Sequence, residues 1–120
     1  MSEMQLGMVE SQFADIIWKN EPITSSNLVK ICEKELEWKK STTFTVLRRL
    51  CQKGIFQNVD GTVTSLISKD EFYSMQSERF VEETFQGSLP AFLAAFTARK
   101  NLTPEEVATL RRMVDEYEEG

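Results

Sequence analysis

The chain has 120 residues, of which 41% are hydrophobic and 28% charged, as expected for one small globular domain with at most an appendage. No apolar run approaches the roughly 18 to 20 residues that cross a bilayer, and the first twenty residues lack the regions of a signal peptide, so a cytoplasmic protein without membrane insertion is expected. Histidine is absent, two cysteines are too few for a zinc site, and no nucleophile motif or glycine-rich phosphate loop occurs, so we expect no enzyme, cofactor or metal.

The net charge of −5 is unevenly distributed along the chain. Residues 1–69 hold nine Lys/Arg and eight Asp/Glu, which gives +1, whereas residues 70–120 hold five and eleven, which gives −6. Residues 38–59 contain no acid and five basic residues: Lys39, Lys40, Arg48, Arg49 and Lys53. This stretch is the one part of the sequence suited to a phosphate backbone.

Two helices are predicted before this basic stretch. The first runs from about Val9 to Lys19, and Pro22 follows its end because proline disfavours helical geometry in the residue before it. Ile23 then forms a one-residue edge strand, and Thr24 or Ser25 caps a second helix. The apolar stripe of that helix is Leu28, Ile31, Cys32 and Leu36.

A third helix is predicted from about Ser41 to Lys53, ended by Gly54. Its apolar side carries Thr43, Val46, Leu47, Leu50 and Cys51, and Phe44 lies at the boundary. Its other side carries Ser41, Thr42, Thr45, Arg48, Arg49 and Gln52. Hydroxyls, an amide and arginines without any acid are groups that bond base edges and phosphates, so this side is a candidate DNA-reading surface.

Asp60-Gly61 separates two β-branched runs, 55–59 and 62–67, and predicts a hairpin with a type I′ turn. Three helices followed by a hairpin match a winged helix-turn-helix whose third helix reads DNA. The expected fold class is therefore mostly α with a small β-hairpin: residues 1–68 form the DNA-binding winged helix, and residues 69–120 form a three-helix dimerisation region.

Three capping signals predict the helices of the second region. Ser68-Lys69-Asp70-Glu71 starts the fourth helix, Ser88 with Pro90 starts the fifth after Gly87, and Thr103-Pro104-Glu105-Glu106 starts the sixth. About 50 residues rich in aromatics struggle to bury their apolar area alone, so we expect a second copy to cover them. The predicted dimer interface comprises Phe72, Phe80, Phe85, Leu89, Phe92, Leu93, Phe96, Leu110, Val114 and Tyr117.

Several motifs, in their order and spacing, resemble the penicillinase and methicillin-resistance repressors, the BlaI/MecI/CopY family. They are Ile16-Ile17-Trp18, Pro22-Ile23-Thr24, Trp38, the run from Thr42 to Leu50, Lys53-Gly54, Gly87-Ser88-Leu89, and Leu102-Thr103-Pro104-Glu105-Glu106. The resemblance implies a homodimer that binds a palindromic operator and represses adjacent genes. It also implies that Ser41, Thr42, Thr45 and Arg49 lie on the DNA side of the third helix.

Members of that family leave DNA by one of two routes, and this sequence departs from both. Copper-type members use a C-terminal cysteine cluster, which is absent here. Penicillinase-type members are cut by a membrane-bound sensor protease, and here the corresponding bond is Ala95–Phe96, with alanine in place of asparagine. Cleavage at this bond is a hypothesis. The hairpin also departs from the family, since residues 58–64 contain Asp60 and no Lys or Arg.

Two other functions compete with a repressor. A winged-helix module that binds protein rather than DNA is favoured by the acidic hairpin and the acidic second region, and opposed by the acid-free residues 38–59. A ligand sensor could use a pocket among Phe80, Phe85, Phe92 and Phe96, although such a stripe at helical spacing is more typical of a core or an interface.

Overall fold

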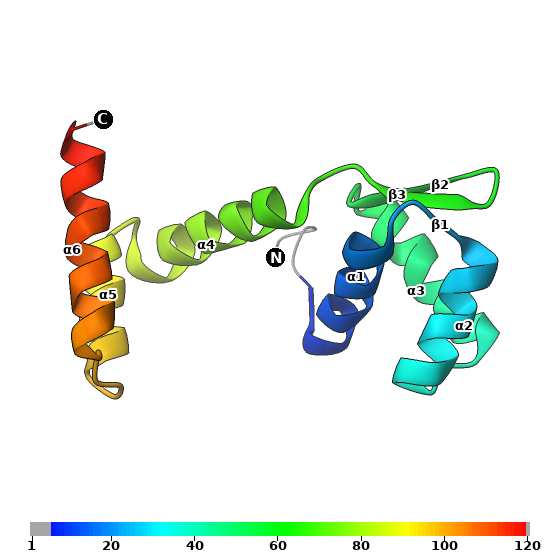
Figure 1. Cartoon of the computed structure of the whole chain (residues 1–120), viewed down its shortest axis with the longest axis horizontal. Coiled ribbons are helices and arrows are strands. Elements are labelled where there is room, and N and C mark those ends of the chain that lie inside the picture. Colours follow the sequence, from blue (N-terminus) through cyan, green and yellow to red (C-terminus); the bar gives the residue numbers. More distant parts are fainter. Residues whose placement is uncertain (1–5, 120) are drawn as a thin grey trace. The chain divides into compact units, whose positions relative to one another are not determined.

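The computed structural model describes residues 6–119, which form six helices and a three-stranded antiparallel sheet (Figure 1). The elements are α1 (Met8–Asn20), β1 (Ile23–Thr24), α2 (Ser25–Leu36), α3 (Lys40–Gln52), β2 (Phe56–Val59), β3 (Thr62–Ser65), α4 (Lys69–Phe85), α5 (Leu89–Thr97) and α6 (Pro104–Glu119). The predicted fold class, a winged helix-turn-helix followed by three helices, is confirmed. The chain divides into two compact units, Met1–Ser77 (unit 1) and Glu78–Gly120 (unit 2), so the division falls inside α4.

The turn between α2 and α3 is short and sharply bent. Glu37 ends α2 in the left-handed region, at φ 57°, and its backbone N–H donates to the Cys32 carbonyl. Trp38 follows, and its ring stacks on Phe13 of α1 with 5.3 Å between ring centroids. The turn is therefore held by an aromatic contact as well as by backbone hydrogen bonds, and this contact anchors the start of α3 to α1.

The sheet has the strand order β1-β3-β2. Ile23 pairs with Val63, so the predicted edge strand exists and is two residues long. Val59 pairs with Thr62 across the tip of the hairpin, and both Asp60 and Gly61 have positive φ (52° and 83°). The predicted type I′ turn is confirmed, because that turn needs φ above zero at both central residues.

One hydrophobic core holds unit 1 together. Its buried side chains come from α1, α2, α3, the turn after α3, the sheet and the first turn of α4: Phe13, Ala14, Ile16, Ile17, Ile23, Leu28, Cys32, Val46, Leu47, Leu50, Ile55, Phe56, Val63 and Phe72. Cys32 is fully buried, and Cys51 is half-buried against the same core. Both thiols are free, and the core position expected for them is confirmed.

Trp18 of α1 joins the helices of unit 1 to α4. Its ring lies 5.2 Å from Phe56 and 5.6 Å from Phe72, measured between centroids, and its Nε1 donates to the Ile67 carbonyl at 3.0 Å. Phe72 is 0% exposed within this cluster. Its expected place in a dimer interface is therefore wrong: its side chain already packs inside its own chain and offers no surface to a second copy.

Unit 2 contrasts with unit 1, because no residue between 78 and 119 is buried. The expected caps are present: Ser88 Oγ accepts from Ala91 N–H, while Thr103 and Glu106 form a reciprocal capping box. Phe80, Phe85 and Phe92 meet edge to face, with centroids 5.7 to 6.0 Å apart. The helices of unit 2 are thus well capped, but none of their apolar side chains is fully buried.

Replacing Phe72 by alanine should lower the free energy of unfolding of unit 1 by about 3 to 5 kcal/mol, because the change leaves a cavity in a filled core. Urea unfolding followed by tryptophan fluorescence measures this, since Trp18 and Trp38, the two tryptophans of the chain, both lie in unit 1. Met75→Ala, at an exposed position of the same helix, is the control and should change it by under about 1 kcal/mol. A loss for Phe72→Ala no larger than the control's would contradict the core assignment.

Candidate nucleic-acid interface

The two sides of α3 differ as the sequence predicts. Thr43, Val46, Leu47 and Leu50 are buried against the rest of unit 1. The side chains expected to meet DNA lie on the opposite side or at the N-terminal end of the helix and are exposed: Lys39, Lys40, Ser41, Thr42, Thr45, Arg48 and Arg49. Burial of one side therefore turns a row of hydroxyl and cationic groups toward solvent, and the role of that row in DNA binding stays a prediction.

The hydroxyl of Thr45 is already oriented by the helix. Its Oγ1 donates to the Ser41 carbonyl at 2.9 Å, so the oxygen lone pairs and the methyl group remain for an outside partner. An acceptor beside a methyl group can meet an exocyclic amine or the methyl of thymine. At the start of the same helix, Lys39 makes no side-chain cap, which leaves first-turn N–H groups able to bond an anion.

Lys53 differs from the other basic residues of this surface. Its side chain is only 23% exposed, and its Nζ lies 3.7 Å from Oε1 of Glu10, a residue of α1. Arg49 also meets this carboxylate, with Nη1 3.3 Å from Oε2. Although residues 38–59 contain no acid, the fold places one beside them. Sequence reasoning missed Glu10, and no local pattern could have found it, because it lies 39 residues before Arg49.

The hairpin brings no positive charge to this surface. Gln57, Asn58, Val59 and Asp60 are exposed, and Gln57 Nε2 donates to Thr64 Oγ1 at 3.1 Å. The Gly61 carbonyl at the tip accepts from the Ser25 backbone N–H at 2.8 Å, which fixes the tip to the start of α2. The hairpin, which is the wing of the winged helix, is therefore fixed against α2 and offers amides and one carboxylate to a partner.

The two thiols are not suited to chemistry. Burial raises the pKa of Cys32 to about 11, and burial also raises the pKa of Cys51 above its ordinary value. Both stay protonated at neutral pH, and a protonated thiol is a poor nucleophile and metal ligand. Among residues 6–119, no group of three or more His, Cys, Asp or Glu could hold a metal ion.

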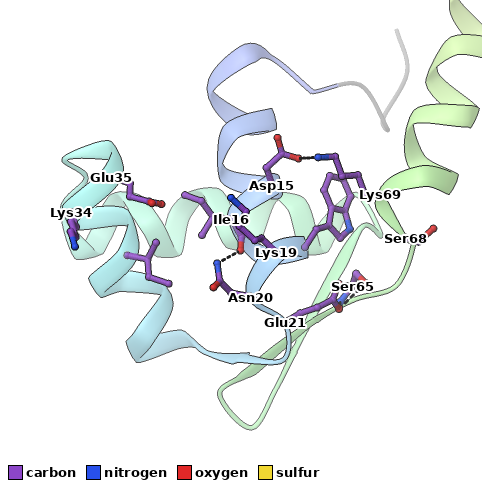
Figure 2. Close-up of a pocket in the computed structure, with 12 residues that line it drawn as sticks. Asp15, Ile16, Lys19, Asn20, Glu21, Lys34, Glu35, Ser65, Ser68 and Lys69 are labelled. Carbon is purple, nitrogen blue, oxygen red and sulfur yellow. Dashed lines mark hydrogen bonds and ion pairs between the residues drawn. The ribbon is translucent and has the colours of Figure 1, made fainter.

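A cavity of about 690 Å³ opens between α1, α2 and the start of α4 (Figure 2). Three carboxylates and three ammonium groups line it, from Asp15, Glu21, Glu35, Lys19, Lys34 and Lys69. Several of these groups already have partners: Lys69 Nζ lies 3.1 Å from Asp15 Oδ1, and Glu21 accepts from Ser65 N–H and Oγ at 2.8 Å. The cavity therefore has balanced charge and no converging set of polar groups that would select a ligand class.

The model of the penicillinase repressor family matches residues 6–116 of this chain. The chain belongs to that family. The penicillinase repressor of Bacillus licheniformis is 26% identical over 117 residues, which cover 94% of this chain and 91% of the relative. The methicillin resistance regulatory protein MecI of Staphylococcus aureus is 22% identical over 115 residues, and a penicillinase repressor of Staphylococcus aureus is 20% identical over 118. They span 92% and 95% of this chain, and 94% of each relative.

The family resemblance drawn from the sequence is thus confirmed, and with it a role in transcription regulation as a repressor. This member of the penicillinase repressor family has an exposed, acid-free side on α3 and a wing that lacks basic residues. No helix within residues 6–119 is both long and apolar enough to cross a membrane.

Proposed function

We propose that this protein is a homodimeric DNA-binding transcriptional repressor that recognises a palindromic operator and places its third helix, α3 (Lys40–Gln52, predicted from the sequence as Ser41–Lys53), in the major groove. The observation that carries the proposal is the chemistry of the exposed side of α3. Ser41, Thr42, Thr45 and Arg49 project from one rigid helix whose other side is locked in the core. Helix-turn-helix proteins read base edges from such a surface. Family membership supports the same function.

Affinity for the phosphate backbone rests on Lys39, Lys40 and Arg48 in this proposal. All three are exposed and lie on or just before α3. Arg49 reads a base, and Lys53 contributes less than its charge suggests, because Glu10 lies beside it. The wing adds no cation, so a second winged helix in a dimer is needed to double the number of phosphate contacts.

A second copy of the chain is the proposed partner of unit 2. No side chain of residues 78–119 is buried, and Phe80, Leu89 and Phe96 are 49%, 56% and 42% exposed. An apolar groove of about 390 Å³ between α5 and α6 is lined by Phe92, Leu93, Phe96, Leu102, Glu105, Glu106, Thr109 and Leu110. Helices that are capped but have no buried core, as in unit 2, are typical of a chain that completes its core by association. The proposed functional division is 1–68 for DNA and 69–120 for dimerisation, with the first turns of α4 anchored on unit 1.

Arg49→Ala should weaken binding to the operator by about 1 to 3 kcal/mol and relax discrimination at the base pair that Arg49 reads. Lys40→Ala should instead weaken binding to all sequences and reduce the salt slope by about 1. The probes are a palindromic duplex selected by the wild-type protein from a random-sequence pool and a scrambled duplex of the same composition. Fluorescence anisotropy across a salt series measures the dissociation constants of each variant for the selected and the scrambled duplex.

Two results would contradict these assignments. Equal, salt-insensitive effects of Arg49→Ala and Lys40→Ala would show that neither side chain has its proposed contact. Failure of the wild-type protein to enrich any duplex, and to shift a palindromic duplex in low salt at micromolar dimer, would favour the competing function, a winged-helix module that binds protein.

In sedimentation at tens of micromolar, the protein should have twice the chain mass of 13.8 kDa. Leu93→Glu should shift it toward monomer, because the new charge enters the groove between α5 and α6. Glu118→Gln, an exposed change near the end of α6, is the control. A strictly monomeric wild-type protein would overturn the dimer.

A membrane-bound sensor protease acting in the cytoplasm is the proposed route of release, with Ala95–Phe96 as the bond that it cuts. Both residues are exposed, and the bond lies inside α5, so the helix must open for a protease to bind extended backbone. Intact mass after co-expression with a sensor encoded beside the repressor gene should show a fragment ending at Ala95. An uncut chain would reject this bond.

A further inference from the structure

Among the described residues, Glu10 in the first turn of α1 meets two cations at the end of α3, Arg49 and Lys53. Glu10 Oε2 lies 3.3 Å from Arg49 Nη1, and Glu10 Oε1 lies 3.7 Å from Lys53 Nζ. Oε1 also accepts the Gly7 backbone N–H at 3.3 Å. The Glu10 side chain is 18% exposed, and each of its carboxylate oxygens has at least one partner.

The cluster of Glu10, Arg49 and Lys53 carries one net positive charge at neutral pH. Burial would raise the pKa of Glu10, but the Gly7 N–H, the Lys53 ammonium and the Arg49 guanidinium together outweigh it and hold the pKa below its ordinary value. The carboxylate is therefore ionised, and one negative charge against two positive charges leaves one. A DNA phosphate approaching the end of α3 therefore meets half of the positive charge that Arg49 and Lys53 would carry without Glu10.

The two cations are affected differently. Lys53 is 23% exposed, whereas Arg49 is 53% exposed. Arg49 meets Glu10 through Nη1, and because a guanidinium has five N–H donors, this contact leaves other donors for a further partner. A side chain held before binding loses less rotamer freedom when it binds.

We propose that Glu10 is a positioning residue for DNA recognition: it orients Arg49 for a base and withholds Lys53 from phosphate. The proposal rests on the DNA-binding function proposed above. As a consequence, this one carboxylate raises discrimination between DNA sequences in two ways. It fixes Arg49, which reads a base, and it lowers the sequence-independent attraction of the protein for DNA phosphates. Glu10 makes no contact with DNA in this scheme and acts only through Arg49 and Lys53.

Glu10→Gln tests the proposal because it removes the charge while keeping the length of the side chain and one acceptor oxygen, which can still accept the Gly7 N–H. Binding to the scrambled duplex should strengthen by about 8-fold per half-site at about 0.1 M salt, and the salt slope should steepen by about 0.9, the contribution of one further phosphate contact. The ratio of selected to scrambled affinity should fall. Glu33→Gln, an exposed carboxylate of α2, makes the same change in net charge and should shift the scrambled affinity far less.

The Arg49→Ala background separates the two routes. In that background, Glu10→Gln should still strengthen binding to the scrambled duplex through Lys53. Because Arg49 is absent, the change can no longer disturb the orientation of a base-reading side chain. The further loss of discrimination at the base pair read by Arg49 should therefore disappear. Lys53→Gln is an independent variant: it should change the salt slope much less than Lys40→Gln does, because Glu10 already offsets the Lys53 charge.

Several outcomes would overturn the inference. Unchanged binding of Glu10→Gln to both duplexes would overturn it, as would weakening by the same factor on both, which indicates a purely structural role. Urea unfolding followed by tryptophan fluorescence shows whether Glu10→Gln folds. If it does not fold, equal salt slopes for Lys53→Gln and Lys40→Gln would overturn the inference instead. Wild-type protein that binds no duplex would overturn the proposed function and this inference together, whereas normal wild-type binding isolates the role of Glu10.

Discussion

The packing of one side of α3 against the rest of unit 1 is the constraint on which the remaining structure depends. Val46, Leu47 and Leu50 enter a core shared with α1, α2 and the sheet. Trp38 stacks on Phe13 and fixes the start of the helix, so α3 can neither rotate about its axis nor slide without opening that core. Because the buried side is fixed, the hydroxyl and arginine side faces solvent as a rigid surface, which is what reading a base sequence requires.

The second unit follows a different physical logic. Its helices begin at good caps, and its phenylalanine rings contact one another, yet none of its residues up to 119 is buried. Local signals are enough to form these helices, but a core needs more apolar area than 40 residues supply. In the proposed dimer, association of two copies would supply that area and would also bring two reading helices to one operator, so stability and operator recognition share one cause.

The charge at the end of α3 depends on a residue that is distant in the sequence and close in space. The chain is acidic overall, α3 is free of acids, and Glu10 then returns a negative charge to the end of that helix. In the proposed complex with DNA, this arrangement gives modest attraction for phosphate and an arginine held in place. Such a balance favours discrimination between sequences over tight sequence-independent binding, because the second term scales with the number of neutralised phosphates.

The sequence alone determined the order of helices and strands, the Asp60-Gly61 turn, the caps and the two sides of α3, because periodicity, turn chemistry and capping act between residues close in the chain. It also carried the family resemblance. Only the tertiary structure decided that Phe72 packs beside Trp18 rather than at an interface, and that Glu10 meets Arg49 and Lys53. Both contacts join residues far apart in the chain, and no local pattern encodes which distant side chain will fill a cavity or offset a charge.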